Sequence, residues 1–303
     1  MLTQAVNTYL AVRRAMGFQL RTEGYHLHAY ARFAVARGED FIHTKTAIDW
    51  AACGPSAHQR ARRLAVVSQF ARYLSAEDPR HDIPPEGIFG SQSRPRPVPF
   101  IFSPEQLSLL LAAATHLGPP GSLRPSTYST LFALLACAGL RIAEAIKLRL
   151  QDWTVDGLLI RESKFRKSRL VPLHDTARAG LERYLVHRRQ IGGADDHLFV
   201  SHDGRRLSYS AARAAFRTAL QAAGLDTVAG RRPCLHSLRH TFAVRALTSC
   251  PDGRGRIAQH TLALSTYLGH YKATATYWYL EATPSLLEDI AAACERWVEE
   301  ASR

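Results

Sequence analysis

A histidine and an arginine stand three residues apart at His236 and Arg239, within a segment of helical periodicity. Residues three apart lie on one face of a helix, so both side chains can reach the same bound group. A guanidinium fork suits a phosphate, because it donates two parallel hydrogen bonds to the phosphate oxygens. The pair is therefore a candidate for phosphate chemistry.

The pair alone is weak evidence in this composition. With 14 histidines and 34 arginines in 303 residues, random order gives about 1.6 such spacings as the chance level for a motif match. A second example, His202 with Arg205, lies beside Gly204 in a polar stretch typical of a turn. We interpret that second pair as a chance match to the spacing, located on a loop.

The surroundings of the first pair raise its significance. Five features follow one another along the chain: AGLRIAE at 138–144, SKFRKSRLVPL at 163–173, LHSLRHTFA at 235–243, LGH at 268–270, and Tyr279 nine residues after His270. Together and in this order they resemble the signature of tyrosine recombinases of the phage integrase family. The resemblance spans roughly residues 103 to 290 and implies an enzyme that cuts and rejoins DNA.

The resemblance implies catalytic roles for six residues: Arg141, Lys164, His236, Arg239, His270 and Tyr279. A tyrosine that attacks a DNA phosphodiester builds charge on the non-bridging oxygens, and the two arginines with the later histidine would stabilise that charge. The 5′ oxygen leaves poorly unless it is protonated, and the lysine would be the general acid. A phenol with a pKa near ~10 needs a base or a cationic pocket, and the earlier histidine is the candidate base.

Plainer interpretations stand beside these roles. Arg141 could cap the preceding helix or pair with Glu144, which we interpret as a structural partner of the site's cations. Lys164 and Lys167 share one charged turn, and only the resemblance selects Lys164. His240, directly after the second arginine, is interpreted as structural rather than catalytic.

Aromatic residues crowd the segment of the expected nucleophile, and an aromatic stripe usually belongs to a core. The spacing from His270 selects Tyr279 and leaves Tyr277 as the second choice; Tyr267 and Tyr271 are the other tyrosines of this segment. One departure from the commoner family pattern is Ala143, where a serine often precedes the glutamate. This change affects a supporting hydrogen bond and removes no catalytic group.

The elements that must position these residues are mostly helices. Helical periodicity predicts several short helices between Leu2 and about Leu74, among them an apolar stripe of Leu64, Val67, Phe70, Ala71 and Leu74. A capping serine and a first-turn proline at 103–104 start a helix, and Gly139 ends another that runs over 127–138. Two short strands are expected at 158–161 and 170–173, followed by helices at about 175–190, 208–222, 236–248, 259–267 and 284–298.

The chain length and a proline-rich segment predict two domains. Five prolines with glycines and serines over 84–99 cannot continue a helix and indicate a linker. We predict a helical DNA core-binding domain at 1–83, a linker at 84–102, and a catalytic domain with a C-terminal helix at 103–303. The expected fold class is mainly α with a small β-sheet, and the catalytic domain is mixed α/β but mostly helical.

Composition narrows the class of protein and of partner. A hydrophobic fraction of 46% with 21% charged residues is that of a globular chain. The apolar runs stay short of the roughly 20 residues that a membrane span needs, and the five cysteines are scattered, so we expect a cytoplasmic protein with no membrane partner. The formal net charge of +13 favours a polyanion such as DNA.

The sequence therefore predicts a site-specific recombinase that acts on double-stranded DNA through a 3′-phosphotyrosine intermediate. The resemblance implies a homo-tetramer in the synaptic complex and requires no metal and no nucleotide cofactor. Integration, excision, transposition and dimer resolution all remain open, as does any need for accessory proteins. The alternatives are a DNA-binding accessory protein of the same fold without strand transfer, and relaxation of DNA like that of a type IB topoisomerase.

Overall fold

The computed structural model describes residues 2–90, 98–161, 168–190, 195–249 and 257–269, together with Thr276 and Tyr279. The chain forms two compact units, Met1–Pro97 and Val98–Arg303. Each unit has its own hydrophobic core.

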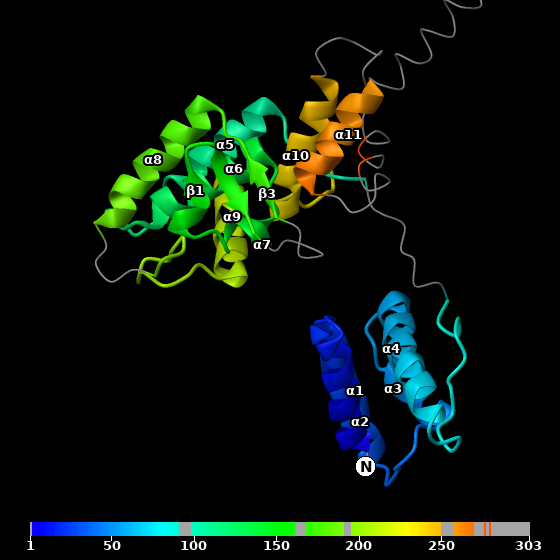
Figure 1. The fold of residues 1–303 in the computed structure, drawn as a ribbon. Coiled ribbons are helices and arrows are strands. Elements are labelled where there is room, and N and C mark those ends of the chain that lie inside the picture. The colour runs from blue at the N-terminus through cyan, green and yellow to red at the C-terminus, as the bar shows by residue number, and fades with distance from the viewer. Residues whose placement is uncertain are drawn as a thin grey trace, which may run out of the picture. The chain divides into compact units, whose positions relative to one another are not determined.

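The first unit is helical, as Figure 1 shows in blue and cyan. It consists of α1 (Leu2–Ala15), α2 (Arg21–Val35), α3 (Thr44–Ala52) and α4 (Ala57–Ser75). The apolar stripe predicted for the last of these helices is buried, as expected. Two large apolar residues of this unit, Met16 and Tyr25, are 66% and 70% exposed. Met16 lies beyond the end of α1, and Tyr25 lies on the outer side of α2.

The described ends of the predicted linker are packed rather than free. Ser68 on α4 donates a hydrogen bond of 2.9 Å to the carbonyl of Pro84, and Phe89 packs against the core of the first unit. On the other side, Phe100 and Phe102 pack into the core of the second unit. The residues just after α4 therefore pack against the first unit.

The second unit combines helices with one small sheet (Figure 1). In chain order its elements are α5 (Pro104–Ala114), α6 (Arg124–Ala138), α7 (Ile142–Ala145), the 3-10 turn η1 (Leu150–Asp152), β1 (Trp153–Thr154), β2 (Gly157–Ile160), β3 (Arg169–Val171), α8 (Asp175–Arg189), α9 (Tyr209–Ala222), α10 (Leu235–Thr248) and α11 (Ile257–Leu268). The strands are antiparallel in the order β1-β2-β3. The predicted fold class is confirmed; the very short α7 and β1 were not foreseen.

Local signals explain the ends of two helices that lead into the site. At the start of α5, Ser103 and Gln106 satisfy each other's backbone N–H groups in a capping box. At the end of α6, Gly139 adopts φ +58°, which turns the chain toward α7. The α10 helix packs on α6 and on α11, so residues from three separate parts of the sequence meet there.

The helix predicted at 284–298 lies outside the described residues. Within the part of the chain that the structure describes, no helix combines the length and apolar character needed to cross a bilayer.

Candidate active site

Arg141 occupies the turn between α6 and α7. Its backbone N–H donates 3.0 Å to a carboxylate oxygen of Glu144, and its Nη1 forms an ion pair of 2.8 Å with the other oxygen. The same guanidinium donates to the carbonyls of Leu268 at 3.4 Å and Gly269 at 3.2 Å. Arg141 therefore pairs with Glu144, as the plainer interpretation expected, and is also held against the end of α11. Its side chain remains 25% exposed, so it can still meet a bound anion.

Glu144 joins two arginines. Its carboxylate accepts from Arg141 and also from Arg169 on β3, at 2.9 and 3.2 Å. Burial alone would raise the pKa of Glu144, but the hydrogen bonds and charges of Arg169 and Arg141 lower it to about 2. The residue is therefore an anion at neutral pH that fixes the two cations, as the sequence interpretation proposed.

Arg239 is the most deeply placed cation of the site. It lies on α10 with 1% exposure, and it donates 2.6 Å to the carbonyl of Gly139 and 2.8 Å to that of Leu268. Burial and the nearby charge of Arg141 lower its pKa to about 10, which leaves the guanidinium charged at neutral pH. The carbonyl of Leu268 thus accepts from both Arg141 and Arg239, and the two guanidinium groups are neighbours although they are 98 positions apart in the sequence.

His236 and His240 lie one turn apart on α10. Their rings meet edge to face, with centroids 4.5 Å apart. His236 reaches solvent at the start of the helix. The surrounding protein and the charges of Arg239 and Arg141 lower the pKa of His236 to about 4, so its ring is neutral at physiological pH.

Tyr279 is buried against α10 and α11. It is 2% exposed and packs in a cluster with Ala243, Val244, Leu264 and Leu268, among others. Its hydroxyl lies 3.2 Å from Nδ1 of His240. The structure thus brings Tyr279 onto the helix that carries His236 and Arg239.

Of the six predicted site residues, Arg141, His236, Arg239 and Tyr279 gather around α10 and the end of α11. Lys164 and His270 lie outside the described residues, as does Tyr277, the second choice of nucleophile.

Two contacts of the site were missed by the sequence interpretation. Arg169 was recognised only as part of a motif, and its pairing with Glu144 joins residues 25 positions apart. His240 was interpreted as structural, and its contact with the tyrosine hydroxyl was not foreseen. The available signal for His240 was its spacing of four residues from His236, which places both on one helix face.

The second histidine–arginine spacing lies elsewhere. His202 and Arg205 occupy the polar turn that precedes α9, and the Arg205 side chain is 85% exposed. This pair is not on a helix, in agreement with its interpretation as a chance match on a loop.

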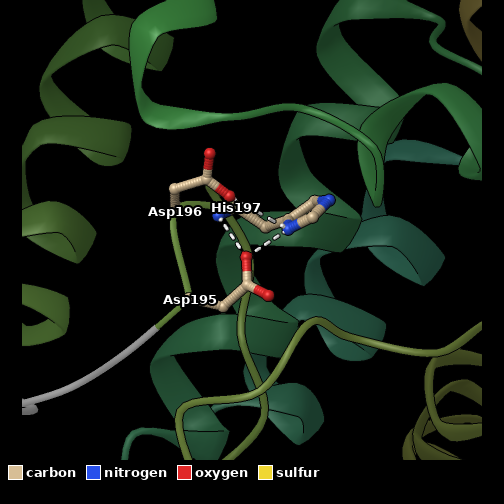
Figure 2. Close-up of side chains that lie close together, drawn as sticks. All are labelled: Asp195, Asp196 and His197. Carbon is tan, nitrogen blue, oxygen red and sulfur yellow. Dashed lines mark hydrogen bonds and ion pairs between the residues drawn. The ribbon is translucent and has the colours of Figure 1, made fainter.

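Among the described residues, one group of possible metal ligands stands together, formed by Asp195, Asp196 and His197 (Figure 2). Nδ1 of His197 is engaged with the Asp195 carboxylate. Asp196 pairs with Arg149 at 2.8 Å, and Arg149 bridges to the backbone of His197. These contacts assign the group a structural role in holding the loop before α9.

Known proteins are similar to this chain in sequence and in fold. The model of the phage integrase family matches residues 101–285. The chain is 38% identical to y4rB of Sinorhizobium fredii, named as a candidate integrase/recombinase, over 97% of this chain and 96% of that protein. It is 32% identical to tyrosine recombinase XerD of Caulobacter vibrioides, over 76% and 73%. In fold it resembles the XerH site-specific recombinase, with a TM-score of 0.67, 19% identity, and coverage of 91% of this chain and 80% of that one.

Proposed function

This chain belongs to the phage integrase family and is a site-specific DNA recombinase, and on that premise we propose that Tyr279 is its nucleophile. In the proposed reaction the tyrosine oxygen attacks a phosphodiester of duplex DNA. The tyrosine becomes linked to the 3′ phosphate, and the 5′ oxygen leaves. Attack by a 5′ hydroxyl on this link reseals the strand, so the energy of the broken bond is retained.

The observation that carries this proposal is the shared anchoring of the two arginines. Arg141 and Arg239 both donate to the carbonyl of Leu268, while Tyr279 packs on the same helix as Arg239. Fixed guanidinium groups stabilise charge that develops on phosphate oxygens without any cost of reorganisation. Two fixed cations beside a tyrosine are therefore well suited to a phosphoryl-transfer transition state.

The remaining roles follow the family pattern. We assign His270 to the non-bridging oxygens and Lys164 to the protonation of the leaving 5′ oxygen, with His236 as the candidate base. A neutral His236 can accept a proton, but its low pKa makes it a weak base. When a phosphate enters the site, its negative charge raises the pKa of His236, because it offsets the two guanidinium charges.

We propose duplex DNA as the substrate and a tetramer as the active assembly. The net charge of +13 suits a polyanion. A lambda integrase with 17% identity to this chain forms a tetramer bound to a Holliday junction. The predicted core-binding unit at 1–83 and the catalytic unit would then hold the DNA from two sides, and the reaction would take place in the cytoplasm.

Trapping on a nicked suicide substrate tests the nucleophile. Tyr279→Phe removes only the attacking oxygen and retains the charge that drives binding, so this variant should bind DNA and form no covalent adduct. Tyr277→Phe serves as the matched control and should form the adduct. The opposite pattern would reject Tyr279. If both variants still form the adduct, both tyrosines are rejected as the nucleophile.

A further inference from the structure

We propose that Arg169 is a positioning residue, which fixes the two arginines of the proposed site through the end of α11 and through Glu144. This inference rests on the proposed roles of Arg141 and Arg239. Arg169 lies on β3, and its side chain is 13% exposed. It is set back from solvent relative to Arg141, whose side chain is 25% exposed.

Each of the three guanidinium nitrogens of Arg169 donates a hydrogen bond within the protein. Nη1 and Nη2 form a fork on the two carboxylate oxygens of Glu144, at 3.2 and 2.9 Å, and Nε donates 2.8 Å to the backbone carbonyl of Tyr267. The direction of each bond is fixed, because a guanidinium only donates and a carbonyl or an ionised carboxylate only accepts. Arg169 is therefore oriented by two other elements, α7 and α11, which suits positioning rather than contact with a substrate.

Three arginines share the carbonyls at the C-terminal end of α11. The last carbonyls of a helix lack partners within it and carry partial negative charge, so cations are stabilised there. The accepting carbonyls are those of Tyr267, Leu268 and Gly269. Arg169 donates to the first of them, Arg239 to the second at 2.8 Å, and Arg141 to the second and the third. A residue that fixes this end of α11 thereby fixes the two proposed catalytic arginines relative to each other.

The turn after α11 packs closely on the Arg169 guanidinium. Gly269 has a φ of +66°, and a Cβ at this position would lie 3.1 Å from Nη1 of Arg169. A residue without a side chain therefore allows this turn and this guanidinium to approach each other. The carbonyl of the same glycine accepts from Arg141, so the turn is in contact with both cations.

Glu144 provides a second route from Arg169 to Arg141. Its Oε1 accepts from Nη1 of both arginines, and its Oε2 accepts from Nη2 of Arg169 and from the backbone N–H of Arg141. A carboxylate held at both oxygens cannot rotate, so it fixes the direction of the Arg141 side chain. Small displacements matter here, because a misplacement of about 1 Å at a reacting centre can cost about 10²-fold in rate.

Arg169→Lys separates position from charge. A lysine retains the positive charge but has a single nitrogen in place of the fork, so it cannot hold Glu144 and the carbonyl of Tyr267 together. We expect this variant to bind DNA as tightly as wild type and to form the adduct on the nicked substrate about 10²-fold more slowly. Arg161→Lys is the matched control and should keep the wild-type rate, because Arg161 directly follows β2 and pairs at 2.6 Å with the buried Asp152 instead.

A second substrate distinguishes displaced cations from a loss of folded protein. A methylphosphonate at the cleaved position has a methyl group in place of one non-bridging oxygen, so its transition state carries one negative charge fewer. The defects of Arg169→Lys and Arg141→Ala should both shrink to less than about tenfold on this substrate. Gly269→Ala, which places a methyl group against the Arg169 guanidinium, should show the same dependence on substrate. A smaller folded fraction would slow both substrates by the same factor.

The results separate this inference from the proposed function. Adduct formation by Arg169→Lys at the wild-type rate, while Arg141→Ala is slow, would overturn the positioning role alone. A defect of Arg169→Lys that has the same size on both substrates would also overturn it. If Arg141→Ala itself forms the adduct at the wild-type rate, the proposed function of the arginines fails, whatever Arg169→Lys shows.

Discussion

At the scale of single residues, Arg239 and Arg141 differ in how deeply they are held. Arg239 is 1% exposed and satisfies the carbonyls of Gly139 and Leu268, whereas the Arg141 side chain is 25% exposed. Removing a buried hydrogen-bonded charge leaves its partners unsatisfied, which costs roughly 1–3 kcal/mol per group. Arg239 therefore has a structural role in addition to its proposed catalytic one.

Arg141→Ala and Arg239→Ala should each slow adduct formation by about 10²- to 10³-fold, the usual cost of losing one donor to transition-state charge. DNA affinity should change much less, since many other cations remain. Rates at saturating DNA and affinities from fluorescence anisotropy separate the two effects.

Arg205→Ala, on the exposed turn before α9, is the control for a lost positive charge. Equal losses of affinity and of cleavage rate in the two site variants would make these arginines ordinary DNA anchors.

The lowered pKa of Glu144 predicts that the free energy of unfolding depends on pH. Its pKa is lowered from 4.5 in the unfolded chain to about 2 in the folded one, so its ionised form stabilises the fold, by on the order of 3 kcal/mol. This contribution is complete above about pH 4.5 and is lost as the pH falls toward about 2.

Urea unfolding of wild type and Glu144→Gln at several pH values measures this contribution. The difference in free energy of unfolding should be largest near pH 7 and should shrink below about pH 4.5. A difference that stays constant down to about pH 2 would show that Glu144 is not held ionised by its arginines.

A cation that belongs to a spaced motif, such as Arg239 of the pair on α10, is easier to predict from the sequence than a cation whose role depends on tertiary packing. In a chain with 34 arginines, nothing local distinguishes Arg169 from a solvated surface charge. Its role arises only when β3 is placed beside α7, which is a tertiary contact between residues 25 positions apart.

At the scale of elements, the close approach of α6 and α10 depends on Gly139. Its φ of +58° is in the left-handed region, and a Cβ there would lie 2.4 Å from a ring carbon of Phe242 on α10. The carbonyl of the same residue accepts from Arg239. Any shift of α10 away from this turn therefore moves a proposed catalytic cation.

Gly139→Ala should destabilise the second unit by more than ~2 kcal/mol, because backbone strain of about 1–3 kcal/mol adds to overpacking. It should also slow adduct formation. Gly224→Ala is a matched control, since its φ is +68° but nothing lies within 4 Å of the added Cβ. Urea unfolding of both variants provides the measurement, and equal losses of stability would remove Phe242 from the explanation.

Helices with capping residues and long apolar periodicity could be predicted from the sequence, as Ser103 and Gln106 illustrate at α5. The four-residue α7 and the two-residue β1 could not be, because periodicity needs a longer window. Their conformations are fixed by contacts such as that of Glu144 with the N–H of Arg141.

At the scale of the whole molecule, positive charge is distributed over both units. Residues 1–100 hold 13 basic and 8 acidic residues, a net +5, and the remaining residues hold 26 and 18, a net +8. Distributed charge suits contact with a polymer from two sides better than a single basic tail does. The distribution of charge can be predicted from the sequence, whereas the arrangement of the side chains in the candidate active site cannot.

Binding of duplex DNA should therefore weaken steeply with salt. If about six phosphates are neutralised, the logarithm of the association constant falls with the logarithm of salt concentration with a slope near −5. Titration of the full chain at several salt concentrations gives this slope. A slope near zero would contradict electrostatic binding by either unit.

The most direct test of the active-site assignment is to identify the residue that carries the DNA. Wild-type protein is trapped on a nicked substrate, the DNA and protein are digested, and the modified peptide is sequenced by mass spectrometry. The account predicts a 3′-phosphonucleotide on the oxygen of Tyr279, the residue that packs on α10, the helix of Arg239, and contacts His240. The same modification on Tyr277, or on any other residue, would contradict it.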